Sequence, residues 1–289
     1  MEGRVLTMWN CLRRWVWILA VVGTGQLPSL NAQAPVRGPL DVFNAGSLAV
    51  PFHRLLRAFG DRHPEVEPAQ ENSGSLAAVR KLTELDKIPD VLAVADYSII
   101  PELLIPRHAS WYATFATNSL ALVYTDGSNG AQEITAQNWF RVLQRPEVRW
   151  GRADPALDPA GYRTQLAFQL AERHYGKPGL ARLLSAAAHP RHMRGKSADL
   201  VALIQLGELD YAWTYTSLAR MHGLRFVPLP PEVSLGVPAL AKWYGTASVR
   251  LPGATLGGRD SVEVRGTPIS YALTVPRDAP HPETAVAFV

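Results

Sequence analysis

The sequence predicts an α/β fold made of two lobes. Short β-rich runs, turns of small residues and helical patterns alternate along the chain from Leu40 onward. The same alternation starts again near residue 120, and no linker rich in Pro, Gly or Ser separates the two halves. Alternating strands and helices are typical of parallel sheets covered by helices. The composition agrees, because 289 residues at 47% hydrophobic and 19% charged are ordinary for a globular protein.

The first 34 residues have the pattern of a secretory signal peptide. A charged start is followed by the apolar run 15–22 and by Ala32-Gln33-Ala34, which resembles an A-x-A cleavage site. The apolar run is too short to span a bilayer stably. We therefore expect cleavage after Ala34 and a periplasmic or otherwise extracytoplasmic protein. Cys11 is the only cysteine in the sequence, so the mature chain contains no disulfide and no thiolate metal site.

The first half contains two strand–turn–helix units. Apolar residues at helical spacing and stop signals at Gly60 and His63-Pro64 define the first helix. A continuous apolar run further on is typical of a buried strand. The predicted elements are the strand 40–43, the helix 50–59, a strand from 66, a helix from about 75 and the buried strand 91–95.

The second half repeats the alternation and adds a long amphipathic helix. Trp139, Trp150 and Trp213 are interpreted as core aromatics. Because strands stand at both junctions, the chain is expected to cross between the lobes, with lobe 1 formed by 35–118 plus 230–289 and lobe 2 by 119–229. The predicted elements are the strand 118–125, the helix 134–143, the extended run 148–150, the loop 154–160, the helices 161–175 and 198–206, and the strand 210–216.

The charge of the chain argues against nucleic-acid binding. The formal net charge is +4, and it falls to +2 once the three arginines and one glutamate of the first 34 residues are removed. Only the run 189–196 is locally basic, and we interpret it as a solvated loop. Nucleic-acid partners usually need Lys and Arg clustered on one face. We therefore expect no nucleic-acid partner.

Three turns place small or hydroxyl residues directly before a helix. The first N–H groups of a helix are unpaired and carry partial positive charge, so such turns can bind anions. They can equally be ordinary helix caps. Gly195-Lys196-Ser197 lacks the glycine that a phosphate loop needs at position 190. The three turns are Gly46-Ser47, Ser73-Gly74-Ser75 and Pro159-Ala160-Gly161.

Six stretches carry a resemblance to a known family. In this order across the mature chain, they are similar to the molybdate/tungstate-binding proteins of ABC transporters, above all the archaeal branch. The resemblance implies a type II periplasmic-binding-protein fold, with a ligand cleft between the lobes. It also implies a monomer without enzyme activity or resident cofactor, which serves a permease and its ATPase. The stretches are VFNAGSLAVPF (42–52), GSLAAVRKLTEL (74–85), DVLAVADYSIIPELLIP (90–106), WYATFATN (111–118), LDPAGYRT (157–164) and GELDYAWTYTS (207–217).

The resemblance also implies which residues bind the oxyanion. Gly46, Ser47 and Ser75 would bind it from lobe 1. From lobe 2, Asp158 would bond to the molybdenum or tungsten, with the following turn Pro159-Ala160-Gly161 beside it. Since Pro159 has no N–H, the backbone donors of that turn would be Ala160 and Gly161.

Thr214 stands where the family has a second carboxylate, a glutamate. A threonine hydroxyl can only donate or accept a hydrogen bond. We therefore expect a tetrahedral or at most five-coordinate metal. Tyr215 is a neighbouring candidate donor, and Glu232 is a weaker candidate for the missing carboxylate.

Two alternative functions stay open, and the sequence differs from the family at its C-terminus. A sulfate- or phosphate-binding protein is the nearest alternative. A secreted serine hydrolase using Ser47 or Ser75 is a more distant one, because none of the eight histidines lies in a matching turn. The run 281–289 stands where the family begins a further helix, so we expect that the C-terminus is truncated.

Overall fold

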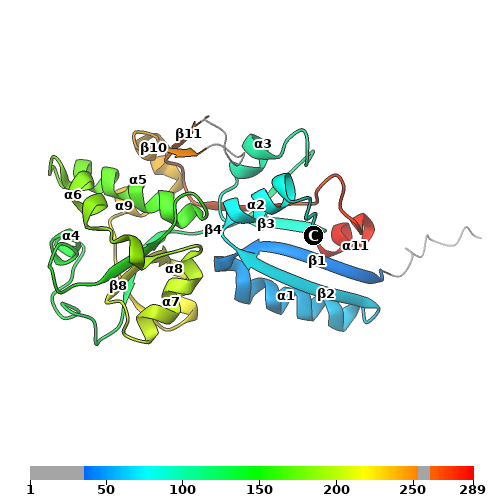
Figure 1. Cartoon of the computed structure of the whole chain (residues 1–289), viewed down its shortest axis with the longest axis horizontal. Coiled ribbons are helices and arrows are strands. Elements are labelled where there is room, and N and C mark those ends of the chain that lie inside the picture. Colours follow the sequence, from blue (N-terminus) through cyan, green and yellow to red (C-terminus); the bar gives the residue numbers. More distant parts are fainter. Residues whose placement is uncertain (1–35, 253–260) are drawn as a thin grey trace, which may run out of the picture. The chain divides into compact units, whose positions relative to one another are not determined.

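The computed structural model describes residues 36–252 and 261–289, so the predicted signal peptide 1–34 lies outside the described residues. Residues 36–289 contain two five-stranded sheets flanked by helices (Figure 1). In the described part of the chain, no helix is long and apolar enough to cross a membrane.

The first sheet has the strand order β2-β1-β3-β12-β4. β1 runs parallel to β2 and β3, whereas β12 runs antiparallel to both β3 and β4. Its strands are β1 (Gly38–Ala45), β2 (Val66–Ser73), β3 (Val91–Val94), β4 (Ala113–Thr117) and β12 (Ser270–Thr274). The helices of the same segments are η1 (Gly46–Leu48), α1 (Ala49–Arg62), α2 (Ser75–Glu84), α3 (Ile99–Leu103) and α11 (Pro282–Phe288).

The second sheet has the strand order β7-β6-β8-β5-β9. β6 is parallel to β7 and β8, and β5 is antiparallel to β8 and β9. Its strands are β5 (Leu120–Tyr124), β6 (Trp150–Ala153), β7 (Met193–Arg194), β8 (Tyr211–Tyr215) and β9 (Arg225–Val227). The helices of this half are α4 (Trp139–Val142), α5 (Pro159–His174), α6 (Leu180–Ala187), η2 (Pro190–His192), α7 (Ser197–Gln205) and α8 (Thr216–Met221).

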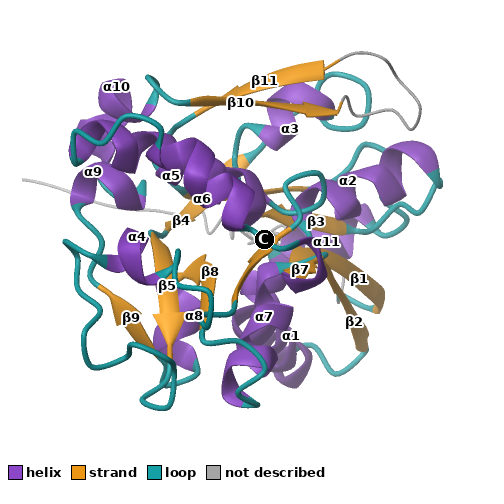
Figure 2. Cartoon of the chain, turned by 60° about the vertical axis from the view of Figure 1, so that its left-hand side comes forward, coloured by secondary structure: helices purple, strands orange, loops and turns teal. Residues whose placement is uncertain are grey.

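The last part of the chain connects both sheets. It contains α9 (Pro231–Ser234), η3 (Pro238–Leu240), α10 (Ala241–Tyr244) and a separate antiparallel hairpin of β10 (Ser248–Pro252) and β11 (Ser261–Arg265). Gln169 of α5 makes two hydrogen bonds with the backbone of Ser248, of 2.7 and 3.2 Å. The hairpin lies beside α3 of the first sheet (Figure 2). Residues 231–250 thus contact α5 before the chain enters β12, and the lobe boundaries remain predictions.

Both sheets are mixed, so the expectation of parallel pairing holds for β1 with β2 and β3 and for β6 with β7 and β8, but not for β5 and β12. β5 is antiparallel to β8 because the chain enters it directly from β4 of the first sheet, without a helical crossover. β12, which is antiparallel to β3 and β4, follows the β10–β11 hairpin. β4 and β5 are joined by only Asn118 and Ser119.

A helix was predicted over residues 134–143, but only α4 (Trp139–Val142) is helical there. Asn138 explains this difference, because its side chain accepts a hydrogen bond from the Thr135 N–H at 2.7 Å and donates one to the Glu133 carbonyl at 2.8 Å. These bonds hold residues 133–138 in a turn. The long predicted helix starts two residues earlier than expected, at Pro159, because Asp158 is its N-cap.

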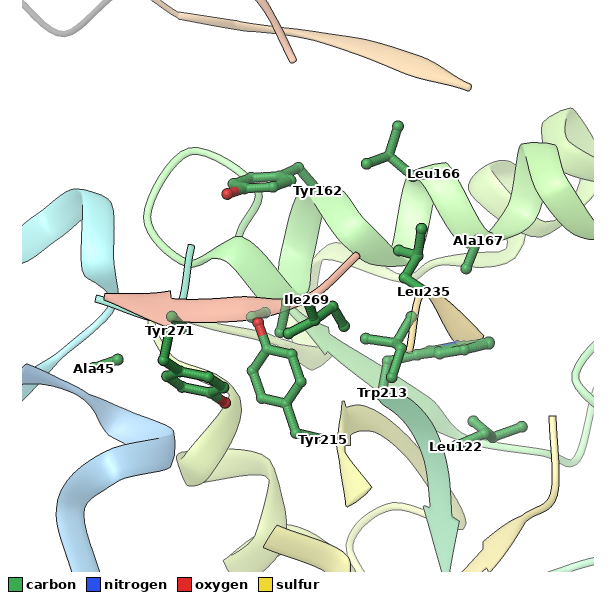
Figure 3. Packing of buried hydrophobic residues seen from close by; sticks show 14 of the residues in the cluster. Ala45, Leu122, Tyr162, Leu166, Ala167, Trp213, Tyr215, Leu235, Ile269 and Tyr271 are labelled. Atoms are coloured by element: carbon green, nitrogen blue, oxygen red, sulfur yellow. The ribbon is translucent and has the colours of Figure 1, made fainter. Parts of the chain in front are cut away.

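The core follows the two-residue period of β8. Tyr211, Trp213 and Tyr215 point to one face and pack against α5, where the rings of Trp213 and Phe168 lie 5.5 Å apart. Ala212 packs on the other face with residues of α7. Figure 3 shows the rings of Tyr215 and Tyr271 side by side, with centroids 6.0 Å apart. The three tryptophans predicted in the core, Trp139, Trp150 and Trp213, are buried.

Candidate functional site

Most of the predicted site residues lie at the ends of strands and the starts of helices. Gly46 and Ser47 form η1, Ser75 is the first residue of α2, and Asp158 caps α5. Pro159, Ala160 and Gly161 form the first turn of α5, and Thr214 and Tyr215 end β8. All of them are buried.

The two serines of the first half keep a donor for a ligand. The Ser47 hydroxyl oxygen accepts a hydrogen bond from the Tyr271 hydroxyl at 3.0 Å. The Ser75 hydroxyl oxygen accepts one from the Ala95 N–H at 2.9 Å. A serine hydroxyl that accepts one bond still carries its own hydrogen. Each serine can therefore donate to an anion while its oxygen stays fixed.

Asp158 shares its carboxylate between two helices. One oxygen accepts the Ala160 N–H of α5 at 2.8 Å, and the other accepts the Ser197 N–H of α7 at 3.1 Å. Burial raises the pKa of Asp158 from 3.8 to about 6, although these two bonds and Arg163 oppose the rise. The Gly161 N–H donates to the Asp158 carbonyl at 2.9 Å. Both backbone donors expected to face the oxyanion are therefore bonded to Asp158 in this arrangement.

The first turn of α2 is capped by a residue of the other half. The N–H groups of Leu76 and Ala77 donate to the Leu157 carbonyl at 3.1 and 3.3 Å. Gly74 allows this approach, because a Cβ there would lie 2.2 Å from the Leu157 carbonyl oxygen. The loop before Asp158 thus closes tightly on the start of α2.

Thr214 and Tyr215 offer different chemistry. The Thr214 hydroxyl is fully buried and has no hydrogen-bond partner within residues 36–252 and 261–289. The Tyr215 hydroxyl accepts a 2.9 Å bond from Arg163 Nη1. Burial raises the pKa of Tyr215 well above 10, so Tyr215 stays neutral. An unpaired buried hydroxyl is costly unless something else supplies its partner.

Glu232 lies apart from the other candidates. It belongs to α9, and its carboxylate lies 3.7 Å from His174 Nδ1. His174 is the last residue of α5, whereas Asp158 precedes the first. A helix of 16 residues is about 24 Å long, so the two carboxylates flank opposite ends of α5. The structure therefore does not bring Glu232 to the place of a missing ligand beside Asp158.

Sequence reasoning missed a buried charged pair beside the candidate site residues. Arg163 Nη2 lies 3.0 Å from Asp96 Oδ2, and Arg163 Nη1 donates to the Ala95 carbonyl at 2.6 Å. The Tyr162 hydroxyl donates to the same Asp96 oxygen at 2.6 Å. Burial alone would lower the pKa of Arg163, but Tyr215 and Asp96 raise it, so the guanidinium stays charged. The sequence feature that could have indicated this pair is Tyr162-Arg163, because these two large polar residues lie on the buried face of α5.

The chain from Leu40 to Val289 matches one family. Residues 40–289 match the model of the bacterial extracellular solute-binding proteins. The chain belongs to this family. A solute-binding protein of Petrotoga mobilis is 40% identical over 254 residues, which cover 88% of this chain and 78% of that protein. The molybdate/tungstate-binding protein WtpA of Thermococcus kodakarensis is 34% identical over 303 residues, covering 95% of this chain and 84% of that one.

Solved structures confirm the predicted type II fold of this solute-binding protein. The periplasmic molybdate-binding protein of Azotobacter vinelandii superposes with a TM-score of 0.58 at 14% identity, over 86% of this chain and 90% of that one. The sulfate-binding protein SubI of Mycobacterium tuberculosis gives 0.61 at 13% identity, over 87% and 80%. Family members are extracytoplasmic binding proteins.

Proposed function

We propose that this chain captures molybdate or tungstate outside the cytoplasm and delivers it to the permease and ATPase of an ABC importer. The observation that carries the proposal is the 34% identity with WtpA over 95% of the chain. The family match over residues 40–289 also includes both serine turns, Asp158 and the end of β8, and these residues are buried.

The proposed binding residues are of two kinds, neutral hydrogen-bond donors and one carboxylate. The hydroxyls of Ser47 and Ser75 donate to the oxygens of the anion without adding a competing cation. Asp158 bonds to the metal, since a carboxylate beside an oxyanion is repulsive unless it does so or carries a proton. The Thr214 hydroxyl supplies a further buried group with free hydrogen-bonding capacity.

The alternatives have weaker support. The likeness to the sulfate-binding protein is at 13% identity and extends to the fold alone. A serine hydrolase needs a base beside its nucleophile. Within the described residues, the Ser47 and Ser75 oxygens bond to the Tyr271 hydroxyl and the Ala95 N–H, neither of which is a general base at neutral pH. We infer that the protein is a carrier and catalyses no reaction.

Calorimetry with molybdate, tungstate, sulfate and phosphate tests the proposal directly. We expect binding of the first two anions in preference to the others, and no turnover of generic esters in a parallel assay. Ser47→Ala and Ser75→Ala should each weaken binding by about 1–3 kcal/mol, the usual cost of losing a hydrogen bond to a charged group. A folded protein that binds none of the four anions would refute it.

X-ray absorption of the tungstate complex tests the role of Thr214. Glu232 lies at the far end of α5 from Asp158. None of the candidate residues therefore supplies a second carboxylate beside Asp158. We therefore expect four- or five-coordinate tungsten, and we expect Thr214→Glu to strengthen tungstate binding relative to sulfate. Six-coordinate tungsten in the unmodified protein would overturn this assignment.

A further inference from the structure

A buried ion pair connects the segments of the two sheets. Asp96 follows β3 of the first sheet, and Arg163 lies on α5, which packs against β6 and β8 of the second sheet. Arg163 Nη2 and Asp96 Oδ2 are 3.0 Å apart, and the two side chains are only 2% and 3% exposed. Nη2 faces Asp96 in ion-pair contact without hydrogen-bond geometry, so the charges are compensated by proximity, while the Tyr162 hydroxyl bonds to Asp96 and Arg163 Nη1 bonds to the Ala95 carbonyl.

The two carboxylate oxygens of Asp96 contact residues from different halves of the molecule. Oδ1 accepts bonds from the N–H and the hydroxyl of Ser98, at 3.1 and 3.0 Å, within its own segment. Oδ2 accepts the Tyr162 hydroxyl and faces Arg163, both on α5. A change confined to Oδ2 would therefore remove the contacts of Asp96 with α5 and leave the Ser98 turn and the Arg163 bond to the Ala95 carbonyl in place.

The connection surrounds the proposed ligand turn 158–161. On its N-terminal side, the Leu157 carbonyl accepts the Leu76 and Ala77 N–H groups of α2. On its C-terminal side, Arg163 donates to the Ala95 carbonyl. Both flanks of the turn are thus held against the first sheet by groups that the ligand does not need.

We propose that Asp96 and Arg163 form a latch between the lobes that slows release of the bound oxyanion. This inference rests on the proposed function. When the lobes separate, both side chains return to water, so the pair exists only in the closed arrangement. They are positioning residues: they hold the turn 158–161 in place and do not bind the anion themselves.

Asp96→Asn is the variant that tests the latch, because its amide can keep the oxygen toward Ser98 while its NH₂ faces Arg163. We expect tungstate to dissociate at least tenfold faster, together with a lower unfolding temperature of the ligand-free protein, because the buried Arg163 charge loses its carboxylate partner. Asp210→Asn is the matched control. Asp210 is equally buried and accepts bonds from Arg149 and Asn129, all within the second half. This control should lower the unfolding temperature and leave the dissociation rate unchanged.

Fluorescence transfer between two labels measures closure independently of affinity. Lys87→Cys and Leu206→Cys, both at exposed positions of different halves, can be labelled in a Cys11→Ser background. Because the latch contains no ligand atom, Asp96→Asn should lengthen the mean label distance even without tungstate. An unchanged distance would overturn the latch, whether or not the protein binds tungstate, whereas failure of the unmodified protein to bind would overturn the proposed function alone.

Arg163→Lys covers the case in which Asp96→Asn does not fold. Lysine keeps the charge but loses the planar fork that reaches Asp96, Ala95 and Tyr215 together. We expect a smaller increase in dissociation rate, and the double variant should dissociate no faster than Asp96→Asn alone. Additive effects of the two changes, or an unchanged rate in Arg163→Lys, would show that the residues do not act as a pair.

Discussion

Two buried carboxylates, Asp96 and Asp158, each divide their two oxygens between different elements. Asp96 bonds to its own turn and to α5, and Asp158 bonds to the first turns of α5 and α7. Such bonds satisfy helix N–H groups that would otherwise be unpaired. The same two residues therefore contribute to stability and stand next to the proposed ligand, so the two roles must be separated by measurement.

Asp158 should make the stability of the ligand-free protein depend on pH. Its pKa is about 6 in the folded protein against an ordinary value of 3.8, so folding favours the protonated form. The stabilisation is complete below about pH 4 and is lost as the pH rises through 6. Relative to Asp158→Asn, the unmodified protein should lose about 2.5 kcal/mol of unfolding free energy between pH 4 and 7. Denaturant titrations at several pH values measure this, and parallel curves for the two proteins would contradict it.

Thr214→Val should have opposite effects on stability and binding. Removing an unpaired buried hydroxyl should raise the unfolding free energy of the ligand-free protein by about 1 kcal/mol, and it should weaken tungstate binding. Denaturant unfolding and calorimetry measure the two effects.

Thr164→Val is the matched control for this prediction. Thr164 is equally buried, but its hydroxyl donates to the Ala160 carbonyl at 2.7 Å, so its loss should lower stability. A loss of stability in both variants would mean that the Thr214 hydroxyl has a partner.

At the scale of elements, three helices of the candidate site have first turns whose N–H groups bond to an acceptor outside the helix. α2 receives the Leu157 carbonyl, and α5 and α7 share Asp158. The caps of α2 and α7 come from residues distant in sequence, whereas Asp158 directly precedes α5. Only the cap of α2 comes from the other half, so the start of α2 depends on how the halves meet. The approach of Leu157 to α2 depends in turn on the missing side chain at Gly74.

Gly74→Ala should therefore hinder closure. The new Cβ would lie 2.2 Å from the Leu157 oxygen and 2.7 Å from the Gly195 oxygen, so the backbones must move apart. We expect at least a tenfold loss of tungstate affinity by calorimetry. Gly195→Ala is the control, since its Cβ would meet only the end of the Leu157 side chain, at 3.7 Å, and equal losses in both variants would contradict the steric explanation.

At the scale of the whole molecule, one ligand held by both halves should stabilise them together. At a free tungstate concentration of 100 times Kd, binding adds about 2.7 kcal/mol, which raises the unfolding temperature by roughly 5–10 °C. We expect one shifted transition in calorimetric scans, with sulfate at the same concentration giving a smaller shift. Two transitions, of which only one moves, would place the ligand on a single half.

The sequence predicted well the helices and turns that are determined by residues close to one another in the chain. The apolar spacing of α1, α2 and α5 and the small residues before them defined three of the turns of the site. The direction of β5 and β12 could not be predicted, because it depends on which strands come together from distant parts of the chain. The Asp96–Arg163 pair was missed for the same reason, since neither residue has a local pattern that indicates its partner.

The two-residue connection between β4 and β5 limits how the sheets can turn relative to each other. A change of angle must be absorbed by the torsions of Asn118 and Ser119 and by the longer return segment before β12. The Asn118 amide donates to the hydroxyls of Ser217 and Tyr271, at 2.7 and 2.9 Å, one in each half. If the sheets turn about this joint, the Asn118 amide must give up these two hydrogen bonds and bond to water instead. Breaking them would add an activation barrier to the turning motion. We therefore expect this joint to influence how fast the protein exchanges its ligand, separately from the affinity for that ligand.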